Sequence, residues 1–243
     1  NLMDHISISR FFAIPKKQNE NSIDLKSGKQ ILSGAGSFFI PFGTKFLNTS
    51  TPNFIRGYGI WGGIDRFEPP DFLKRIPDSK TGFLIGHGEV LPSQENKVTL
   101  SNEIDRWGIP LPHINCEWGK NEKAMADHMA KTIKEIIEVS GGIMLPINQL
   151  FKIPLMETFL ENAVALKDEA PPPGYYIHEV GGAPMGENAE DSVLDRFNRL
   201  WQCQNVLVVD GSCWPSSGWQ SPTLTMMAIT RRACKKALSH SSE

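Results

Sequence analysis

The residue types best suited to chemistry lie in the last third of the 243-residue sequence. His178 stands in a glycine-rich run, Asp210 closes the apolar run 205–210 with Gly211 after it, and Pro222 stands where a helix is predicted to begin. Ligands of α/β units gather at the carboxyl ends of parallel strands, and the amides at a helix N-terminus favour an anion or an electron-rich carbonyl. This combination predicts a site for a redox cofactor that carries a diphosphate and a ring.

The predicted site is only half of a usual dinucleotide site. No Gly-x-Gly-x-x-Gly follows a predicted strand, so the cradle that normally holds a diphosphate is absent. Two of the residues also have ordinary structural interpretations: Asp210 suits a turn or a helix cap, and a single histidine such as His178 is more often a packed core residue. The predicted cofactor-binding residues are Asp210, Gly211, Pro222, Thr223 and Thr225.

Composition and charge exclude several classes of protein. Hydrophobic residues make up 40% and charged residues 21% of the chain, which is ordinary for a globular protein. A formal net charge of -2 argues against a nucleic-acid partner, and no apolar run reaches the roughly 20 residues that span a bilayer. The first residues carry neither the basic nor the apolar region of a secretory signal. The widely spaced cysteines favour reduced thiols in a cytosolic protein, so a cytoplasmic location is expected.

The cysteines and histidines carry no metal-binding pattern. The sequence contains no Cys-x-x-Cys and no His-x-x-x-His, so no metal site is predicted. A disulfide framework is not expected at this density of cysteine in a chain of this size, and reduced thiols are predicted. The four cysteines are Cys116, Cys203, Cys213 and Cys234.

The first half of the chain is predicted to consist of strands followed by one long helix, which together help to position the candidate site residues. Residues 6–12 alternate Ile-Ser-Ile-Ser, a period of two that predicts a half-buried strand. Apolar residues at helical spacing then predict one long amphipathic helix over 120–139, which the pair Gly141–Gly142 ends. The other predicted strands lie within 31–42, 54–63, 83–92, 97–101 and 112–118.

The second half of the chain is predicted to be less regular. Residues 143–177 show no periodicity, and the proline-rich run 169–176 reads as a stiff connector. Residues 205–210 are nearly all apolar, which is typical of a strand buried on both faces of a parallel sheet. Residues 222–238 begin with proline and end with basic residues, as a helix does.

The same runs resemble the C-terminal signature of the glucose–methanol–choline (GMC) oxidoreductases. The resemblance rests on residues 178–186 and 191–233, which follow the family's His-x-x-Gly-Thr-x-x-Met-Gly and its later Asn-Pro-x-x-Thr run. Residues 88–114 and 121–125 resemble the bacterial sugar-oxidising branch, and residues 1–5 resemble the run that closes the family's flavin-binding half. The resemblance covers essentially the whole chain but only the second half of a family protein.

The resemblance implies an FAD enzyme that moves a hydride from an alcohol carbon to flavin N5. His178 falls on the position of the catalytic base, and a pKa near 6.5 suits imidazole to that role. Ser221 falls where the family has the Asn or His that holds the same hydroxyl oxygen, and its hydroxyl is shorter and less basic, with Gln220 as the alternative donor. Residues 182–184, Gly-Ala-Pro, also depart from the family's pattern and supply no side-chain donor there.

The predicted fold class is α+β. A mainly antiparallel substrate-domain sheet with flanking helices is followed by a C-terminal strand–loop–helix that completes an α/β FAD-binding domain. Residues 1–177 form the substrate-binding domain, whose first ten or so residues lead out of the FAD domain, and residues 178–243 carry the histidine. Tyr58 and Trp61 suit a platform for a sugar ring, although core packing is the favoured interpretation.

Three interpretations of the function stay open. In the first, the chain is the C-terminal portion of an FAD-dependent oxidoreductase that acts on a small alcohol or sugar, with the N-terminal FAD-binding half upstream or on another chain. In the second, it is a degenerate, non-catalytic module that binds a sugar or a protein. In the third, it is the structural remnant of a broken gene.

Overall fold

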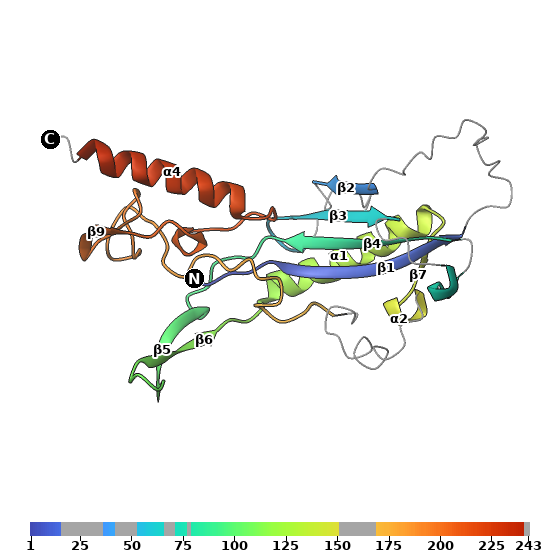
Figure 1. Ribbon diagram of the computed structural model, residues 1–243, viewed down its shortest axis with the longest axis horizontal. Coiled ribbons are helices and arrows are strands. Elements are labelled where there is room, and N and C mark those ends of the chain that lie inside the picture. The colour runs from blue at the N-terminus through green and yellow to red at the C-terminus, as the bar shows by residue number, and fades with distance from the viewer. Residues whose placement is uncertain (16–35, 42–52, 66–70, 77–78, 151–168, 241–243) are drawn as a thin grey trace. The chain divides into compact units, whose positions relative to one another are not determined.

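The computed structural model describes residues 1–15, 36–41, 53–65, 71–76, 79–150 and 169–240 (Figure 1). The chain divides into two compact units: unit 1 comprises residues 1–6, 88–123 and 172–243, and unit 2 comprises residues 7–87 and 124–171. The elements in chain order are β1 (Ile6–Pro15), β2 (Gly36–Ile40), β3 (Tyr58–Ile64), η3 (Asp71–Leu73), β4 (Ser79–Gly88), β5 (Lys97–Ile104), β6 (Pro110–Asn115), α1 (Lys120–Val139), β7 (Ile143–Met144), α2 (Ile147–Leu150), β8 (Arg199–Leu200), β9 (Cys203–Leu207), η5 (Gly211–Cys213) and α4 (Thr223–His240).

Unit 2 is built on a five-stranded sheet with the strand order β2-β3-β4-β1-β7. β2 pairs antiparallel with β3, and β7 pairs antiparallel with β1. In Figure 1 the arrows of β3 and β4 point in opposite directions. The predicted antiparallel sheet is therefore confirmed. The strand predicted to be half-buried is covered on both faces, since Ser7 is 2% exposed beside Ile6 and Ile8 at 0% and 2%.

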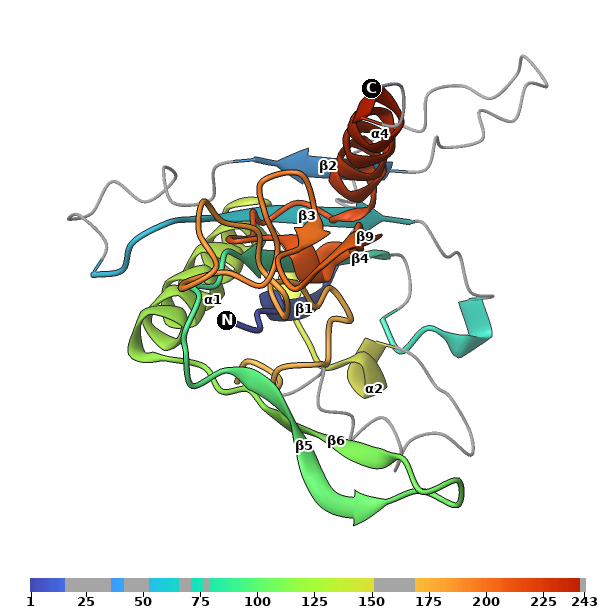
Figure 2. The same cartoon turned by 90° about the vertical axis from the view of Figure 1, so that its left-hand side faces the viewer.

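Helix α1 covers one face of this sheet, as Figure 2 shows. Its bounds match the helix predicted over 120–139. The packing is close, because a Cβ placed on Gly86 of β4 would lie 2.3 Å from the Sδ atom of Met129. The helix ends where Gly141 adopts a φ of 73°, a conformation that glycine reaches without strain. Four of its side chains, one turn apart, are at most 1% exposed: Met125, Met129, Ile133 and Ile137.

The two aromatic residues of β3 differ in burial. Tyr58 is 1% exposed, and its hydroxyl lies 2.8 Å from Nδ1 of His128 and 2.7 Å from Oγ1 of Thr132. Burial raises the pKa of Tyr58 to about 12. The indole of Trp61 donates to Nε2 of His87 at 3.0 Å. Core packing therefore fits Tyr58, whereas Trp61 is only partly buried and stacks on the exposed Phe39.

Residues 57–62 match the letters of Gly-x-Gly-x-x-Gly but not its structure. Strand β3 begins at Tyr58, so the run lies within a strand and does not turn from a strand into a helix. Its glycines serve strand packing: a Cβ on Gly62 would lie 2.5 Å from the carbonyl oxygen of Phe83 in β4. This run therefore supplies no diphosphate cradle.

The segment 143–177, which was expected to be irregular, contains two short elements within its described part, β7 and α2. Residues 151–168 lie outside the described residues.

In unit 1, β5 and β6 form a two-stranded antiparallel hairpin. Its turn is closed by the carboxylate of Asp105, which accepts from the amides of Trp107 and Ile109 at 2.8 and 2.9 Å.

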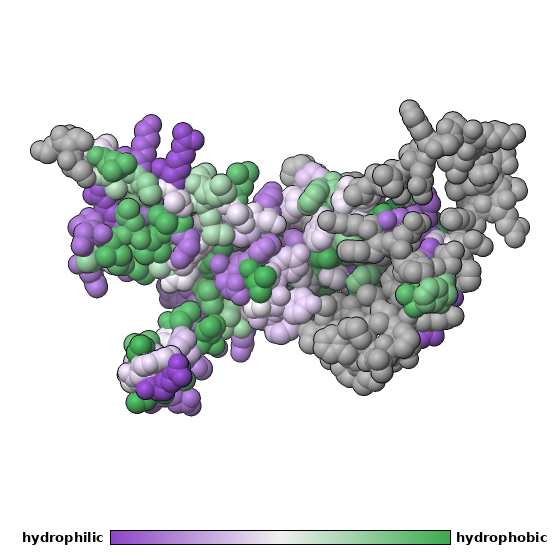
Figure 3. Space-filling model, viewed as in Figure 1, coloured by the Kyte–Doolittle hydropathy of each residue, from purple (hydrophilic) through white to green (hydrophobic). Residues whose placement is uncertain are grey.

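The last strand differs from its prediction. β9 covers Cys203–Leu207, pairs antiparallel with β8, and is exposed along most of its length, with Val206 38% exposed. Burial on both faces was expected from the apolar run 205–210, and that expectation is wrong for the described residues of this chain. Two-sided burial needs other elements packed on both faces of a strand, and the described residues do not cover β9 in this way. Within its sheet β9 pairs with β8 alone. Figure 3 shows the resulting apolar surface around β9.

Candidate active site

A buried carboxylate organises the segment that carries His178. Asp4 is 1% exposed, and its two oxygens accept four backbone N–H groups. Oδ1 accepts from His5 at 2.7 Å and from His178 at 3.0 Å. Oδ2 accepts from Gly174 at 2.9 Å and from Tyr176 at 3.3 Å. A charged acceptor makes stronger hydrogen bonds than a neutral one, so Asp4 holds the loop 174–178 in one conformation.

The N-terminal segment and the histidine segment are also joined through their backbones. Met3 and Val180 form an isolated antiparallel bridge in which each amide donates to the other carbonyl at 2.9 Å. Both side chains are buried, at 0% and 1% exposure. The bridge therefore fixes Met3 next to Val180, which is distant in sequence, and Asp4 directly follows Met3.

This arrangement brings two imidazole rings together. Nδ1 of His178 lies 3.1 Å from Nδ1 of His5, and Nε2 of His5 lies 2.7 Å from the carbonyl oxygen of Gly218. The two rings are perpendicular, with centroids 5.0 Å apart and an interplanar angle of 89°. The ring of Tyr176 lies 5.0 Å from that of His178 and 6.2 Å from that of His5.

Burial lowers the pKa of both histidines. For His5 the next influence is the hydrogen bond to Gly218, which raises the pKa, while for His178 the carboxylates of Asp4 and Glu179 oppose the lowering. A depressed pKa keeps an imidazole neutral at neutral pH, and a neutral imidazole can accept a proton. His178 therefore has the chemistry that a general base needs.

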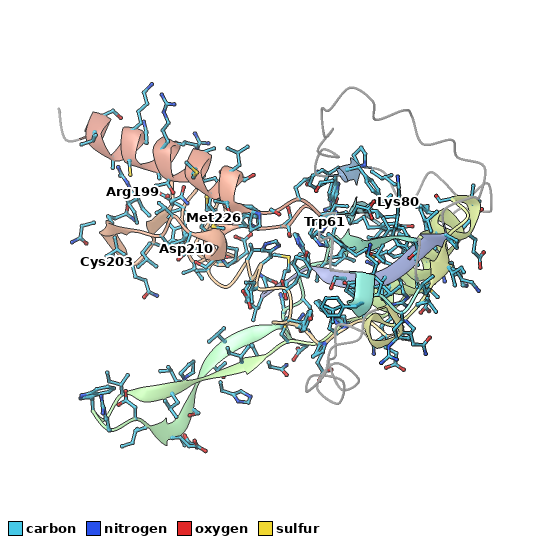
Figure 4. All side chains as sticks on the ribbon, turned by 45° about the vertical axis from the view of Figure 1, so that its right-hand side comes forward. Trp61, Lys80, Arg199, Cys203, Asp210 and Met226 are labelled. Atoms are coloured by element: carbon cyan, nitrogen blue, oxygen red, sulfur yellow. The ribbon has the colours of Figure 1, made fainter. Side chains whose placement is uncertain are left out.

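The run after His178 packs against the turn that follows β9. Gly181 donates to the carbonyl of Gly211 at 3.1 Å, and Ala183 donates to that of Ser212 at 2.8 Å. Asp210 is the N-cap of η5: its carboxylate accepts from the amide of Ser212 at 2.8 Å and also from that residue's hydroxyl. The cap role considered from sequence is therefore present. Figure 4 shows Asp210 near Met226 in the first turn of α4.

Gly211 is required by a contact within the chain. A Cβ at this position would lie 2.9 Å from Cγ1 of Val180 and 3.0 Å from the carbonyl oxygen of Glu179. The segment that carries His178 fills the space beside Gly211 on this side, where a cofactor was expected to approach the backbone closely. Gly211 thus contributes to the site by setting the position of that segment.

Replacement of Gly211 by alanine is expected to destabilise the protein by about 1–3 kcal/mol, because the backbone of residues 179–180 must shift. Gly182→Ala is the matched control, since its Cβ would meet only the Cβ of Ser212 at 3.9 Å, an ordinary contact. Urea unfolding of both variants measures the difference. Equal losses would show that the approach of Val180 to Gly211 does not matter.

The start of α4 presents hydrogen-bond donors. The ladder of this helix begins where the amide of Met226 donates to the carbonyl of Pro222 at 3.0 Å, so the amides of residues 223–225 lie outside that ladder. Pro222 is buried, whereas Thr223 and Thr225 are exposed. Amides and hydroxyls at a positive helix end suit the carbonyl oxygens of the predicted flavin ring. On this donor chemistry the residues fit the ring side of FAD.

Ser221 and Gln220 are both exposed in the loop before α4. The same loop contains Gly218, whose carbonyl oxygen accepts from Nε2 of His5. The histidine pair and the loop that carries the predicted substrate partner are therefore connected by a direct hydrogen bond. The roles assigned to Ser221 and Gln220 stay predictions.

Sequence reasoning did not identify three residues of this cluster. Asp4, His5 and Gly218 were not among the predicted site residues, although the run Asn-Leu-Met-Asp-His at 1–5 supported the family resemblance. That run was itself the available signal, because it places a carboxylate, which can accept several backbone N–H groups, next to a second imidazole. Which segment it anchors is visible only in the folded chain.

Comparison with known structures first places the fold. The crystal structure of pyridoxine 4-oxidase from Mesorbium loti superposes on 97% of this chain and 42% of its own, with a TM-score of 0.52 and 15% sequence identity. This likeness shows an α+β fold found in an oxidase. A family model described as GMC oxidoreductase matches residues 92–230, which is more than half of the chain. The chain belongs to the GMC oxidoreductase family, whose members are FAD flavoproteins.

Named relatives are dehydrogenases and oxidases. The 2-methyl-1,2-propanediol dehydrogenase of Mycolicibacterium austroafricanum is 33% identical over 147 residues, which cover 60% of this chain and 23% of that protein. The fructose dehydrogenase large subunit of Gluconobacter japonicus is 28% identical over 156 residues, which cover 64% and 25%. A long-chain-alcohol oxidase of Arabidopsis thaliana is 24% identical over 235 residues, which cover 94% and 31%. The chain thus spans about a quarter to a third of the length of these relatives.

No helix among the described residues combines the length and the apolar character that crossing a bilayer requires. No group of three or more His, Cys, Asp or Glu side chains in the described part of the chain is arranged to hold a metal ion.

Proposed function

We propose that this chain is the C-terminal portion of an FAD-dependent oxidoreductase that oxidises a CH–OH group of an alcohol or a sugar. Family membership and the names of the relatives, which include a propanediol and a fructose dehydrogenase, support the reaction class. The observation that carries the proposal to residues is the position of His178, a neutral imidazole whose backbone is held by Asp4 and whose ring is held by His5.

His178 acts in this proposal as the base that accepts the proton of the substrate hydroxyl. Loss of that proton pushes electron density onto the carbon that gives up the hydride. Ser221 holds the same hydroxyl oxygen through its own hydroxyl, which both donates and accepts. The lowered pKa of His178, caused by burial, keeps the ring ready to accept at neutral pH.

Bound FAD supplies the acceptor of the hydride. Thr223 and Thr225 at the start of α4, together with the amides that follow the buried Pro222, would hold the ring side of the cofactor by donating hydrogen bonds to it. Asp210 and Gly211 shape the adjoining turn. The diphosphate cradle belongs to an FAD-binding half that lies upstream or on another chain, and residues 178–243 complete that domain while residues 1–177 face the substrate. We place the assembled protein in the cytoplasm.

A non-catalytic module is the second candidate function, and two departures from the family's pattern favour it. Ser221 replaces the usual Asn or His, and residues 182–184 lack the usual side-chain donor. A module of this kind retains the fold and binds a sugar or a protein without turnover. A remnant of a broken gene predicts neither binding nor turnover.

Anaerobic reduction of the flavin tests the proposal. The intact protein that contains this chain is expected to purify with FAD and to lose its flavin absorbance when mixed with an oxidisable member of a panel of primary alcohols, diols and sugars. Methyl ethers of the same compounds are the control, because they have no hydroxyl proton for His178 to accept. A colourless protein, or a flavin that no CH–OH compound reduces, would favour the non-catalytic module.

A further inference from the structure

The carbonyl of Gly218 determines where neutral His5 carries its proton. A carbonyl oxygen only accepts, so the 2.7 Å contact between it and Nε2 of His5 requires the proton to be on Nε2. A neutral imidazole has one N–H, and Nδ1 of His5 is therefore an acceptor. His5 is 2% exposed, so its ring cannot exchange this arrangement for one with water.

The position of the proton on His178 follows from its position on His5. Because Nδ1 of His5 accepts, the nitrogen that lies 3.1 Å away, Nδ1 of His178, must donate. We infer that His5 is a positioning residue which holds His178 in the Nδ1–H tautomer, through a relay that starts at the carbonyl of Gly218. Nε2 of His178 is then the nitrogen that carries the basic lone pair.

This inference rests on the proposed function, in which His178 accepts the substrate proton, and it names the accepting atom as Nε2. After proton transfer His178 is an imidazolium whose Nδ1–H still donates to His5, and a hydrogen bond from a charged donor is stronger than one from a neutral donor. The contact therefore orients the base before the transfer and stabilises the cation after it. A third group that orients a base in this way recurs in catalytic sites.

The relay depends on both rings being neutral, and their surroundings favour that state. Burial, the largest influence, lowers the pKa of His5 and of His178, while the charge of Asp4 raises both pKa values and that of Glu179 raises the pKa of His178. Tyr176 packs against both rings. A protonated His5 would donate from Nδ1 as well, which would force the proton of His178 onto Nε2 and remove the base.

Nitrogen NMR of the full chain labelled with ¹⁵N-histidine reads the tautomers directly, at a pH above both pKa values. The wild type is expected to show His178 protonated on Nδ1 and His5 on Nε2. His5→Phe keeps a ring but removes the acceptor, so the proton of His178 is expected to move largely to Nε2. His5→Asn keeps an acceptor oxygen close to the place of Nδ1 and is expected to retain the Nδ1 proton. His128→Phe, on α1, is the control and should leave the signals of His178 unchanged.

The inference is overturned if wild-type His178 carries its proton on Nε2, or if His5→Phe folds and leaves the proton on Nδ1. The wild-type spectrum decides the matter even where a variant does not fold. In the intact flavoprotein, His5→Phe is expected to reduce turnover on the order of 10–100-fold at constant flavin content, with His5→Asn restoring most of it. Unchanged turnover in His5→Phe, where His178→Ala is inactive, refutes the positioning role. Full turnover in His178→Ala refutes the proposed function instead, and the spectrum still decides the tautomer.

Discussion

Replacement of His178 by alanine in the intact flavoprotein is expected to reduce turnover on the order of 10²–10⁴-fold, the usual contribution of a general base. The flavin content is expected to stay unchanged, because His178 is held by Asp4 and His5 and not by the predicted cofactor-binding residues. Flavin content and the rate of anaerobic flavin reduction, measured on the same preparation, separate a loss of chemistry from a loss of cofactor.

One control variant and two comparison variants make this result specific. His113→Ala removes an exposed histidine of β6 and is expected to leave turnover unchanged. Ser221→Ala is expected to cost less than His178→Ala, because a neutral hydrogen bond contributes about 0.5–1.5 kcal/mol, and Ser221→Asn restores the family's usual pairing. If Ser221→Ala is as damaging as His178→Ala, the assignment of His178 as the principal base is wrong.

Replacement of Asp4 by alanine is expected to lower the free energy of unfolding by about 3 kcal/mol or more. Four backbone N–H groups lose a charged acceptor at once, and each donor left buried without a partner costs about 1–3 kcal/mol. Water reaches some of these donors, since Gly174 is exposed and Tyr176 is partly exposed, so the four losses do not simply add. Urea unfolding of the chain measures the change.

Asp105→Ala is the matched control for this prediction. Asp105 also accepts two backbone N–H groups, but its hydrogen bonds lie in the exposed turn of the β5–β6 hairpin. Water replaces an exposed acceptor, so a loss of only about 0.5–1.5 kcal/mol is expected. Asp4→Asn should fall between the two alanine variants, because its amide NH₂ opposes two of the four donors. Similar losses for Asp4→Ala and Asp105→Ala would contradict the anchoring role of Asp4.

Local regularities of the sequence were sufficient to predict most of the helices and strands. Met125, Met129, Ile133 and Ile137 repeat once per helical turn, and the glycines that follow end the helix, so α1 was predicted over the residues that it occupies. Alternation predicted β1 because successive side chains of a strand point to opposite faces. The start of α4 was placed within one residue by Pro222, which suits the first turn of a helix and not its interior.

Burial could not be predicted in the same way. The apolar run 205–210 has the composition of a strand buried on both faces, yet β9 pairs with β8 and lies largely exposed in the described part of the chain. Ser7 shows the opposite error, since a polar residue at the expected outer face of β1 is 2% exposed. Burial depends on which elements lie beside a strand, and residues far away in the sequence supply those elements.

By itself the sequence determined the family and most of the regular elements, because both depend on residue types at short spacing, and the family resemblance in turn made His178 the candidate base. Only the tertiary structure decided what surrounds that base. Asp4 and His5 meet residues 174–178 and Gly218 from the other end of the chain. The proton of an imidazole is placed by the hydrogen bond that its other nitrogen makes, and that partner is fixed by the folding of the whole unit.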